Sequence, residues 1–141
     1  MKGKIRVAVV VDLPLLREGI VHALSNAKNI VVVAGTQPGL EGLTRSRLSV
    51  DILIVELTTT AGSFQFIEKV SEQHPGTSIL LLGEAGDPRA VISALKGGAR
   101  GYVLTSVSGS DLIEAVRQLA LGESYVSPNL AAQLLGASII E

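Results

Sequence analysis

Short runs of apolar residues alternate along the chain with segments in which apolar residues recur every three or four positions. The short runs are nearly continuous in apolar character and rich in β-branched residues, which is typical of parallel strands covered on both faces. The segments between them predict amphipathic helices. The predicted strands are Ile5–Val11, Ile30–Ala34, Ile52–Val55, Ile79–Leu82 and Tyr102–Leu104, and the predicted helices span residues 14–25, 40–48, 63–74, 88–97 and 108–121.

Residues that favour helix ends support the first and the last of these helices. Pro14 suits the first turn of a helix, where a missing N–H has no consequence. Ser108 and Asp111 have the spacing of a capping box. Gly122 is placed to end the last helix in a left-handed conformation.

Five strand-then-helix units in a row predict a parallel sheet with right-handed crossover connections. We therefore expect an α/β fold of the flavodoxin-like (βα)5 type, a three-layer sandwich with strand order 2-1-3-4-5. In such folds functional side chains gather beyond the carboxyl ends of the strands, because those ends meet at one edge of the sheet. The residues that follow or end the strands there are Asp12, Glu56, Gly83 and Thr105.

The composition narrows the possible functions. At 141 residues, the chain has the length of one domain with a sizeable core. Its 12 basic and 13 acidic residues are dispersed and give a net charge of −1, so we expect no direct binding of nucleic acid. The lack of cysteine excludes disulfides and thiolate metal sites and is compatible with the cytoplasm. The apolar run Val7–Val11 is too short for a membrane span, and we expect no membrane association.

Three segments of the chain match one protein family in order and at that family's spacing. Residues 9–19 are similar to the sequence V-D-D-H-P-L-V-R-E-G, residues 97–104 to A-G-A-R-G-Y-L-L-K, and residues 121–128 to R-G-E-x-Y-L-S-P. The chain therefore resembles the receiver domains of bacterial response regulators, in the NarL/FixJ (LuxR-type) subfamily. The resemblance covers almost the whole chain and implies a signalling domain that accepts a phosphoryl group on an aspartate.

The residues that would carry the family's chemistry differ in this chain. The resemblance implies a phosphoaccepting aspartate after the third strand, a pair of acids that holds Mg²⁺, a Thr or Ser switch residue, an aromatic switch residue and a lysine. The differences indicate an atypical, degenerate receiver, or pseudo-receiver. The corresponding residues here are Glu56 for the aspartate, Val11 and Asp12 for the acid pair, Gly83 and Tyr102 for the two switch positions, and Thr105 for the lysine.

These differences predict a domain without phosphorylation chemistry. Phosphoryl transfer depends on positioning and on neutralisation of charge, and the lysine and one Mg²⁺ ligand are missing. Mg²⁺ prefers several oxygen ligands, so a site with Val11 in place of a carboxylate would hold it at most weakly. The longer side chain of Glu56 displaces the attacking oxygen by about an ångström, which can slow a reaction about a hundredfold. We expect no catalytic residue, no enzyme activity, and no resident metal or cofactor.

Several of these residues also have plainer interpretations. Asp12 is interpreted as a cap of the first helix in preference to a metal ligand. Glu56 is either a phosphomimic or a solvated carboxylate. Tyr102 is expected to be a fixed packing aromatic with its hydroxyl at the surface. His22 and His74 are expected to be surface or packing residues, and the hydroxyl-rich loop 58–63 is expected to be a plain polar loop.

The sequence supports two functional hypotheses. The first is a receiver in signal transduction and transcription regulation that acts without phosphorylation, through protein–protein contacts with an attached or associated output domain. Family members usually carry a helix-turn-helix output domain that binds DNA. The alternative is a pseudo-receiver that senses a small molecule in the vacated pocket around Asp12, Glu56, Gly83 and Thr105. A third reading, a weakly active receiver or a flavodoxin-like enzyme, has no support in the sequence.

The last residues predict a helix beyond the domain. We divide the chain into a receiver-like domain at residues 1–124 and a tail helix or linker at residues 125–141, leading toward an output domain outside these residues. Ser127 and Pro128 suit a helix start. Leu130, Leu134 and Leu135 then share a face that has no assigned place in the core. This face either packs on its own domain or contacts a partner, and we expect a homodimer through the tail or through the first and fifth helices.

Overall fold

Strands and helices alternate along the chain, as the sequence pattern predicts. The computed structural model describes residues 3–36, 50–56, 61–84, 88–127, 131–132 and 135. All five predicted strands and four of the predicted helices are confirmed, and the helix predicted at 40–48 lies outside the described residues. The elements are β1 (Ile5–Val10), α1 (Pro14–Ser25), β2 (Ile30–Thr36), β3 (Ile52–Glu56), α3 (Ala61–Gln73), β4 (Ser78–Gly83), α4 (Pro88–Lys96), β5 (Gly101–Leu104), α5 (Gly109–Ala120) and β6 (Tyr125–Val126).

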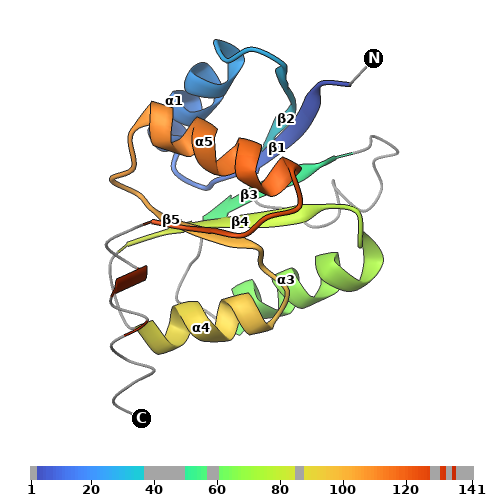
Figure 1. Ribbon diagram of the computed structural model, residues 1–141, viewed down its shortest axis with the longest axis vertical. Coiled ribbons are helices and arrows are strands. Elements are labelled where there is room, and N and C mark those ends of the chain that lie inside the picture. The colour runs from blue at the N-terminus through green and yellow to red at the C-terminus, as the bar shows by residue number, and fades with distance from the viewer. Residues whose placement is uncertain are drawn as a thin grey trace.

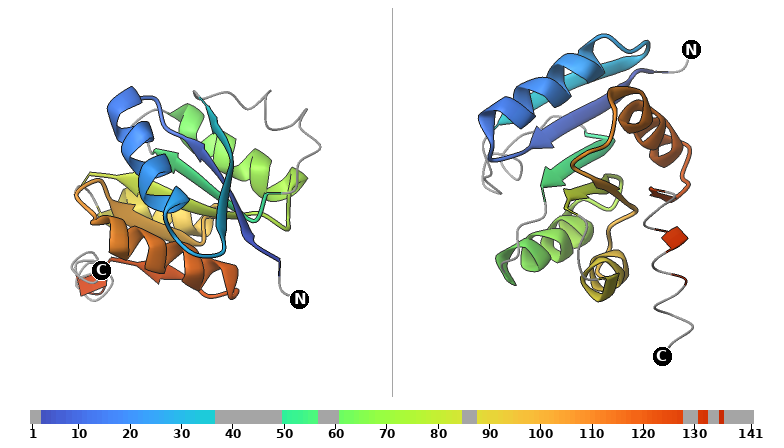
Figure 2. Two further views of the ribbon diagram at one scale, coloured as in Figure 1. Left: turned by 90° about the horizontal axis from the view of Figure 1, so that it is seen from above. Right: turned by 90° about the vertical axis from the view of Figure 1, so that its left-hand side faces the viewer.

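The strands form one parallel sheet in the order β2-β1-β3-β4-β5-β6. The predicted flavodoxin-like order 2-1-3-4-5 is therefore confirmed, with one more strand at the edge. Helices α1 and α5 cover one face of the sheet, and α3 and α4 cover the other (Figure 1). The right-hand view of Figure 2 shows the same three layers from another side.

Alternate residues of each central strand enter the two layers of the core. In β1, Val7 and Val9 pack with α1 and α5, whereas Ala8 and Val10 pack with α3 and α4. The same alternation holds in β3 and β4. Both faces of the sheet are thus apolar, which explains why the strands read as continuous apolar runs and not as an alternation of apolar and polar residues.

The sixth strand is a feature that the sequence analysis missed. Tyr125 pairs with Gly101 and Val126 pairs with Tyr102. These two residues therefore belong to the sheet and not to the tail in which the sequence analysis placed them. A strand of two partly buried residues is too short to produce a periodic pattern. The division of the remaining chain into a domain and a tail stays a prediction.

The start of α1 corrects the prediction that Asp12 caps this helix. The N-cap residue is Leu13, whose carbonyl oxygen accepts a hydrogen bond from the Arg17 N–H at 2.9 Å, and the cap has no side-chain hydrogen bond. Pro14 at the start of the helix fixes the cap one residue after Asp12. Asp12 is therefore left exposed at the end of β1, in the connection to α1.

Both predicted ends of α5 are confirmed. The hydroxyl oxygen of Ser108 accepts a hydrogen bond from the Asp111 N–H at 3.1 Å. Gly122 has a φ of 87°, and its N–H and that of Glu123 donate to the carbonyl oxygens of Leu119 and Gln118. This is a Schellman motif, which ends the helix and turns the chain toward β6.

We predict that Gly101→Ala destabilises the domain by about 1–3 kcal/mol, the range for overpacking a filled core. A Cβ atom at Gly101 would lie 2.9 Å from the Tyr125 carbonyl oxygen and 2.9 Å from Leu80 Cδ1, so β6 or the core would have to shift. Gly76→Ala is the matched control, because a Cβ atom there has no neighbour within 4 Å. Denaturant unfolding of both variants tests this, and equal stabilities would contradict the packing described for β6.

Candidate functional site at the carboxyl edge of the sheet

The strand register brings the four predicted strand-end positions to one edge of the sheet. Val10 lies opposite Val55, which places Asp12 just beyond the end of β3. Glu56 lies opposite Leu82, one residue before Gly83. The Thr105 N–H donates to the Gly83 carbonyl oxygen at 2.8 Å. The expectation that Asp12, Glu56, Gly83 and Thr105 share an edge follows directly from this pairing.

Glu56 is held by the backbone of the neighbouring strand. Its Oε1 atom accepts a hydrogen bond from the Asp12 N–H at 3.3 Å, and the side chain is partly buried. The Asp12 side chain is exposed. The two carboxylates therefore stand at adjacent strand ends, with one of them oriented by a peptide N–H. Among the residues that the structure describes, no three His, Cys, Asp or Glu side chains gather in a group that could hold a metal ion.

Val11 is part of the core and does not face this edge as a ligand would. Its side chain is 0% exposed and packs in the layer formed with α1 and α5. Its carbonyl oxygen accepts a hydrogen bond from Arg17 Nη1 at 2.8 Å. A carboxylate at this position would be desolvated among Val, Ile and Leu side chains unless the loop moved.

Arg17 is a residue of the site that the sequence analysis missed. Its guanidinium group reaches from the first turn of α1 to the end of β1. A signal was available, because a basic residue in the first turn of a helix opposes the helix dipole and needs another reason to be there. The bond to the Val11 carbonyl is such a reason, since it satisfies a backbone oxygen just beyond the end of the strand.

Tyr102 corrects the expectation of a hydroxyl at the surface. The residue is a packing aromatic, as predicted, but its side chain is only 3% exposed and lies in the layer of α3 and α4. Its hydroxyl donates to the Glu84 carbonyl oxygen at 3.4 Å, just after β4. Burial raises the pKa of the Tyr102 phenol, and the Glu84 carboxylate adds to the increase.

The remaining candidates do not join this edge. His22 is exposed on α1, with its Nε2 atom 3.3 Å from Asn26 Nδ2, and His74 follows α3 as a partly buried residue. Both are surface or packing residues, as predicted. The loop at 57–60 lies outside the described residues, as do the side chains of residues 61–63. Within the parts of the chain that the structure describes, no helix is long and apolar enough to cross a membrane.

The comparison with known sequences finds response regulators. The oxygen regulatory protein NreC of Staphylococcus epidermidis is 32% identical over 133 residues, which are 92% of this chain and 61% of NreC. The nitrate/nitrite response regulator NarL of Escherichia coli is 31% identical over 129 residues, 87% of this chain and 60% of NarL. The chain thus spans about three fifths of the length of the relatives that it matches. No family model matches the chain.

The comparison with solved structures gives receiver domains. The isolated receiver domain of RcsB from Salmonella enterica serovar Typhimurium has a TM-score of 0.84 at 22% identity, and the match covers 94% of this chain and 99% of that one. The receiver domain of NarL from Mycobacterium tuberculosis has a TM-score of 0.75 at 29% identity, with 86% of this chain and 100% of that one covered.

In sequence the chain is similar to response regulators, and its fold is that of their receiver domains. Its homologues and structural neighbours are response regulators of the NarL/LuxR family.

We predict that Tyr102→Phe makes the stability of the domain less sensitive to alkaline pH. Above pH 10, the ordinary pKa of tyrosine, the unfolded chain loses the Tyr102 proton while the folded chain keeps it, because its pKa is raised. Stability from this group is therefore complete below pH 10 and is lost as the pH rises through the raised pKa. Denaturant unfolding between about pH 7 and pH 11 should show a shallower decline for the variant. Parallel declines for both proteins would show that Tyr102 is not desolvated.

Proposed function

We propose that this chain is an atypical receiver that transmits signals through protein–protein contacts without accepting a phosphoryl group. The observation that supports the proposal is the set of residues at the carboxyl edge of the sheet. One oriented carboxylate, Glu56, stands beside one exposed carboxylate, Asp12. The neighbouring positions are a buried valine, a glycine and a threonine, at Val11, Gly83 and Thr105.

Val11, Gly83 and Thr105 each lack a functional group that phosphoryl transfer uses. Transfer needs a positioned nucleophile and charges that neutralise the phosphoryl oxygens. Val11 offers no ligand to Mg²⁺, and the ion usually takes one or two carboxylates together with phosphate. Gly83 has no hydroxyl to bond the phosphoryl group, and Thr105 has no positive charge. Because these groups serve one reaction together, their joint absence argues more strongly than any single difference. We propose that the domain has no enzymatic activity and no resident metal or cofactor.

The proposed partner is an output domain, fused or separate, in transcription regulation. Family members usually carry a helix-turn-helix domain, and the relatives named above are longer than the matched region. The dispersed charges of this chain argue against direct nucleic-acid binding by these residues and against a membrane surface. We propose a cytoplasmic protein that forms a homodimer.

We predict that neither this protein nor its Glu56→Asp variant becomes phosphorylated by acetyl phosphate and Mg²⁺. The substitution returns the shorter nucleophile, but the second acid and the lysine that neutralise the phosphoryl charge are still missing, so no phosphorylated protein should accumulate. Intact mass measured after incubation reports the addition of one phosphoryl group.

The matched variant for this experiment combines Glu56→Asp with Val11→Asp, Gly83→Thr and Thr105→Lys. It should label better than the single variant, provided that thermal unfolding shows it is folded with a carboxylate at the buried position 11. Efficient labelling of wild-type protein at Glu56, or of the single variant, would contradict the proposed function.

We predict that the protein dimerises and that removal of residues 127–141 weakens the dimer. The Ala131 N–H donates to the Ser127 carbonyl oxygen at 2.8 Å, in helical spacing, and Leu135 is 66% exposed. An apolar helical face in water favours association. Sedimentation equilibrium at about 10–50 µM, where specific dimers commonly associate, measures this. A dimer that truncation leaves unchanged would contradict the prediction and point to α1 and α5 as the contact. Two monomeric proteins would contradict it as well.

A further inference from the structure

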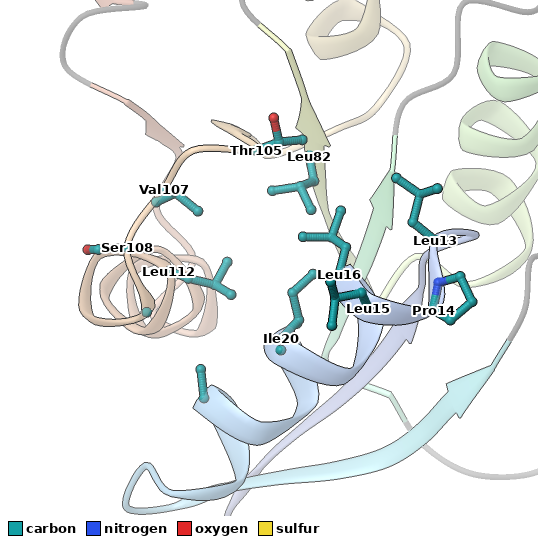
Figure 3. Close-up of a pocket in the computed structure, with 13 residues that line it drawn as sticks. Leu13, Pro14, Leu15, Leu16, Ile20, Leu82, Thr105, Val107, Ser108 and Leu112 are labelled. Carbon is teal, nitrogen blue, oxygen red and sulfur yellow. The ribbon is translucent and has the colours of Figure 1, made fainter.

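An apolar hollow lies between the start of α1 and the connection from β5 to α5. Its volume is about 590 Å³, within the range of ligand pockets in proteins. Figure 3 shows Val107 and Leu112 on one side, facing Leu16 and Ile20 on the other. The floor is formed by side chains of the core, since Ile20, Leu82 and Leu112 are each at most 5% exposed. The hollow is therefore open to solvent and has a floor made by side chains of the core.

The chemistry of the lining defines what could occupy it. None of its residues carries a charge, and its side-chain hydroxyls are those of Thr105 and Ser108. The Ser108 hydroxyl already accepts the Asp111 N–H as the cap of α5. A charged molecule would lose its hydration here without gaining a partner, so the occupant must be uncharged and mainly apolar.

The mouth of the hollow has an apolar lip. Leu13, in the β1–α1 connection, is 55% exposed, and Leu15, in the first turn of α1, is 84% exposed; both line the hollow. Covering exposed leucines beside an apolar cavity removes apolar surface from water, which favours binding. The described tail residues do not line the hollow; these residues are Ala131, Ala132 and Leu135.

The hollow also touches the two connections that carry the candidate site. Leu13 directly follows Asp12, and Thr105 lines the hollow while its N–H bonds to Gly83. An occupant would therefore contact the same backbone segments that a phosphoryl group at the edge of the sheet would reach. The vacated pocket expected around Asp12, Glu56, Gly83 and Thr105 shares only Thr105 with this hollow.

We propose that the hollow between α1 and α5 binds an uncharged, apolar small molecule, and that this ligand is the input of the domain in place of phosphorylation. The inference rests on the proposed function, because a domain without phosphoryl chemistry needs another input. Binding would fix the β1–α1 and β5–α5 connections relative to each other and so change the surface presented to a partner.

The test uses N-phenyl-1-naphthylamine, an uncharged fluorescent probe, titrated into the full chain. We expect a saturable rise in fluorescence with one probe bound per chain. Leu15→Glu should weaken binding at least about tenfold, because it puts a charge at the apolar mouth. Leu15 is exposed, so this variant should stay folded. Leu121→Glu is the matched control, since Leu121 is 75% exposed at the opposite end of α5 and does not line the hollow.

A second variant fills the hollow from within. Ala23 lines it and lies 3.4 Å from where a Cβ atom at Gly109 would be, so Ala23→Phe should abolish probe binding. Ala120→Phe is its control on the exposed surface of α5.

No saturable binding by the wild-type chain, or equal weakening by Leu15→Glu and Leu121→Glu, would overturn the proposal. If the wild-type chain binds no probe and forms a dimer that only Leu15→Glu dissociates, the occupant of the hollow is a second copy of the chain. That result would also overturn the proposal. The two claims fail separately: phosphoryl labelling contradicts the proposed function whether or not the probe binds, and failure of probe binding contradicts this inference whether or not the chain is labelled.

Discussion

The pairing of β1 with β3, and of β3 with β4, is the constraint on which the rest of the structure depends. With Val10 opposite Val55 and Glu56 opposite Leu82, the strands end almost level. This register lets the Asp12 N–H reach Glu56 and brings Gly83 and Thr105 to the same edge. Because both faces of these strands are buried, a shift by one residue would move each side chain to the other layer of the core, and both layers would have to repack.

The same edge shows how packing and chemistry compete for a position. Val11 continues the alternation of β1 and joins the layer of α1 and α5, where a valine stabilises and an isolated carboxylate would destabilise. Val11 therefore contributes to the core, and its side chain has no oxygen atom to offer a metal ion. Arg17 completes the arrangement by bonding the Val11 carbonyl oxygen. These two contacts stabilise the end of β1. The apolar hollow lies next to it, between α1 and α5.

Much of the fold could be predicted from the sequence, because continuous apolar runs and helix-end residues act locally. Ser108 and Gly122 illustrate this, since the cap and the Schellman motif depend only on neighbouring residues. The features that were missed depend on tertiary contacts. The Tyr125–Val126 strand exists because β5 offers an edge, and the burial of Tyr102 follows from the packing of α3 and α4. The strand ends of the candidate site could be predicted from topology, whereas the hollow arises from side chains of separate elements that no spacing in the sequence connects.

The proposal that the carboxyl edge of the sheet does not recognise a phosphoryl group can be tested directly. Its most direct test is a pair of ¹H–¹⁵N spectra of the protein with Mg²⁺, before and after addition of beryllofluoride, which mimics the phosphoryl group on a carboxylate. We expect the amide signals of Asp12, Glu56, Gly83 and Thr105 to stay unchanged. Saturable shifts confined to these four amides would contradict the account and show that the edge still binds the group that its residues no longer match.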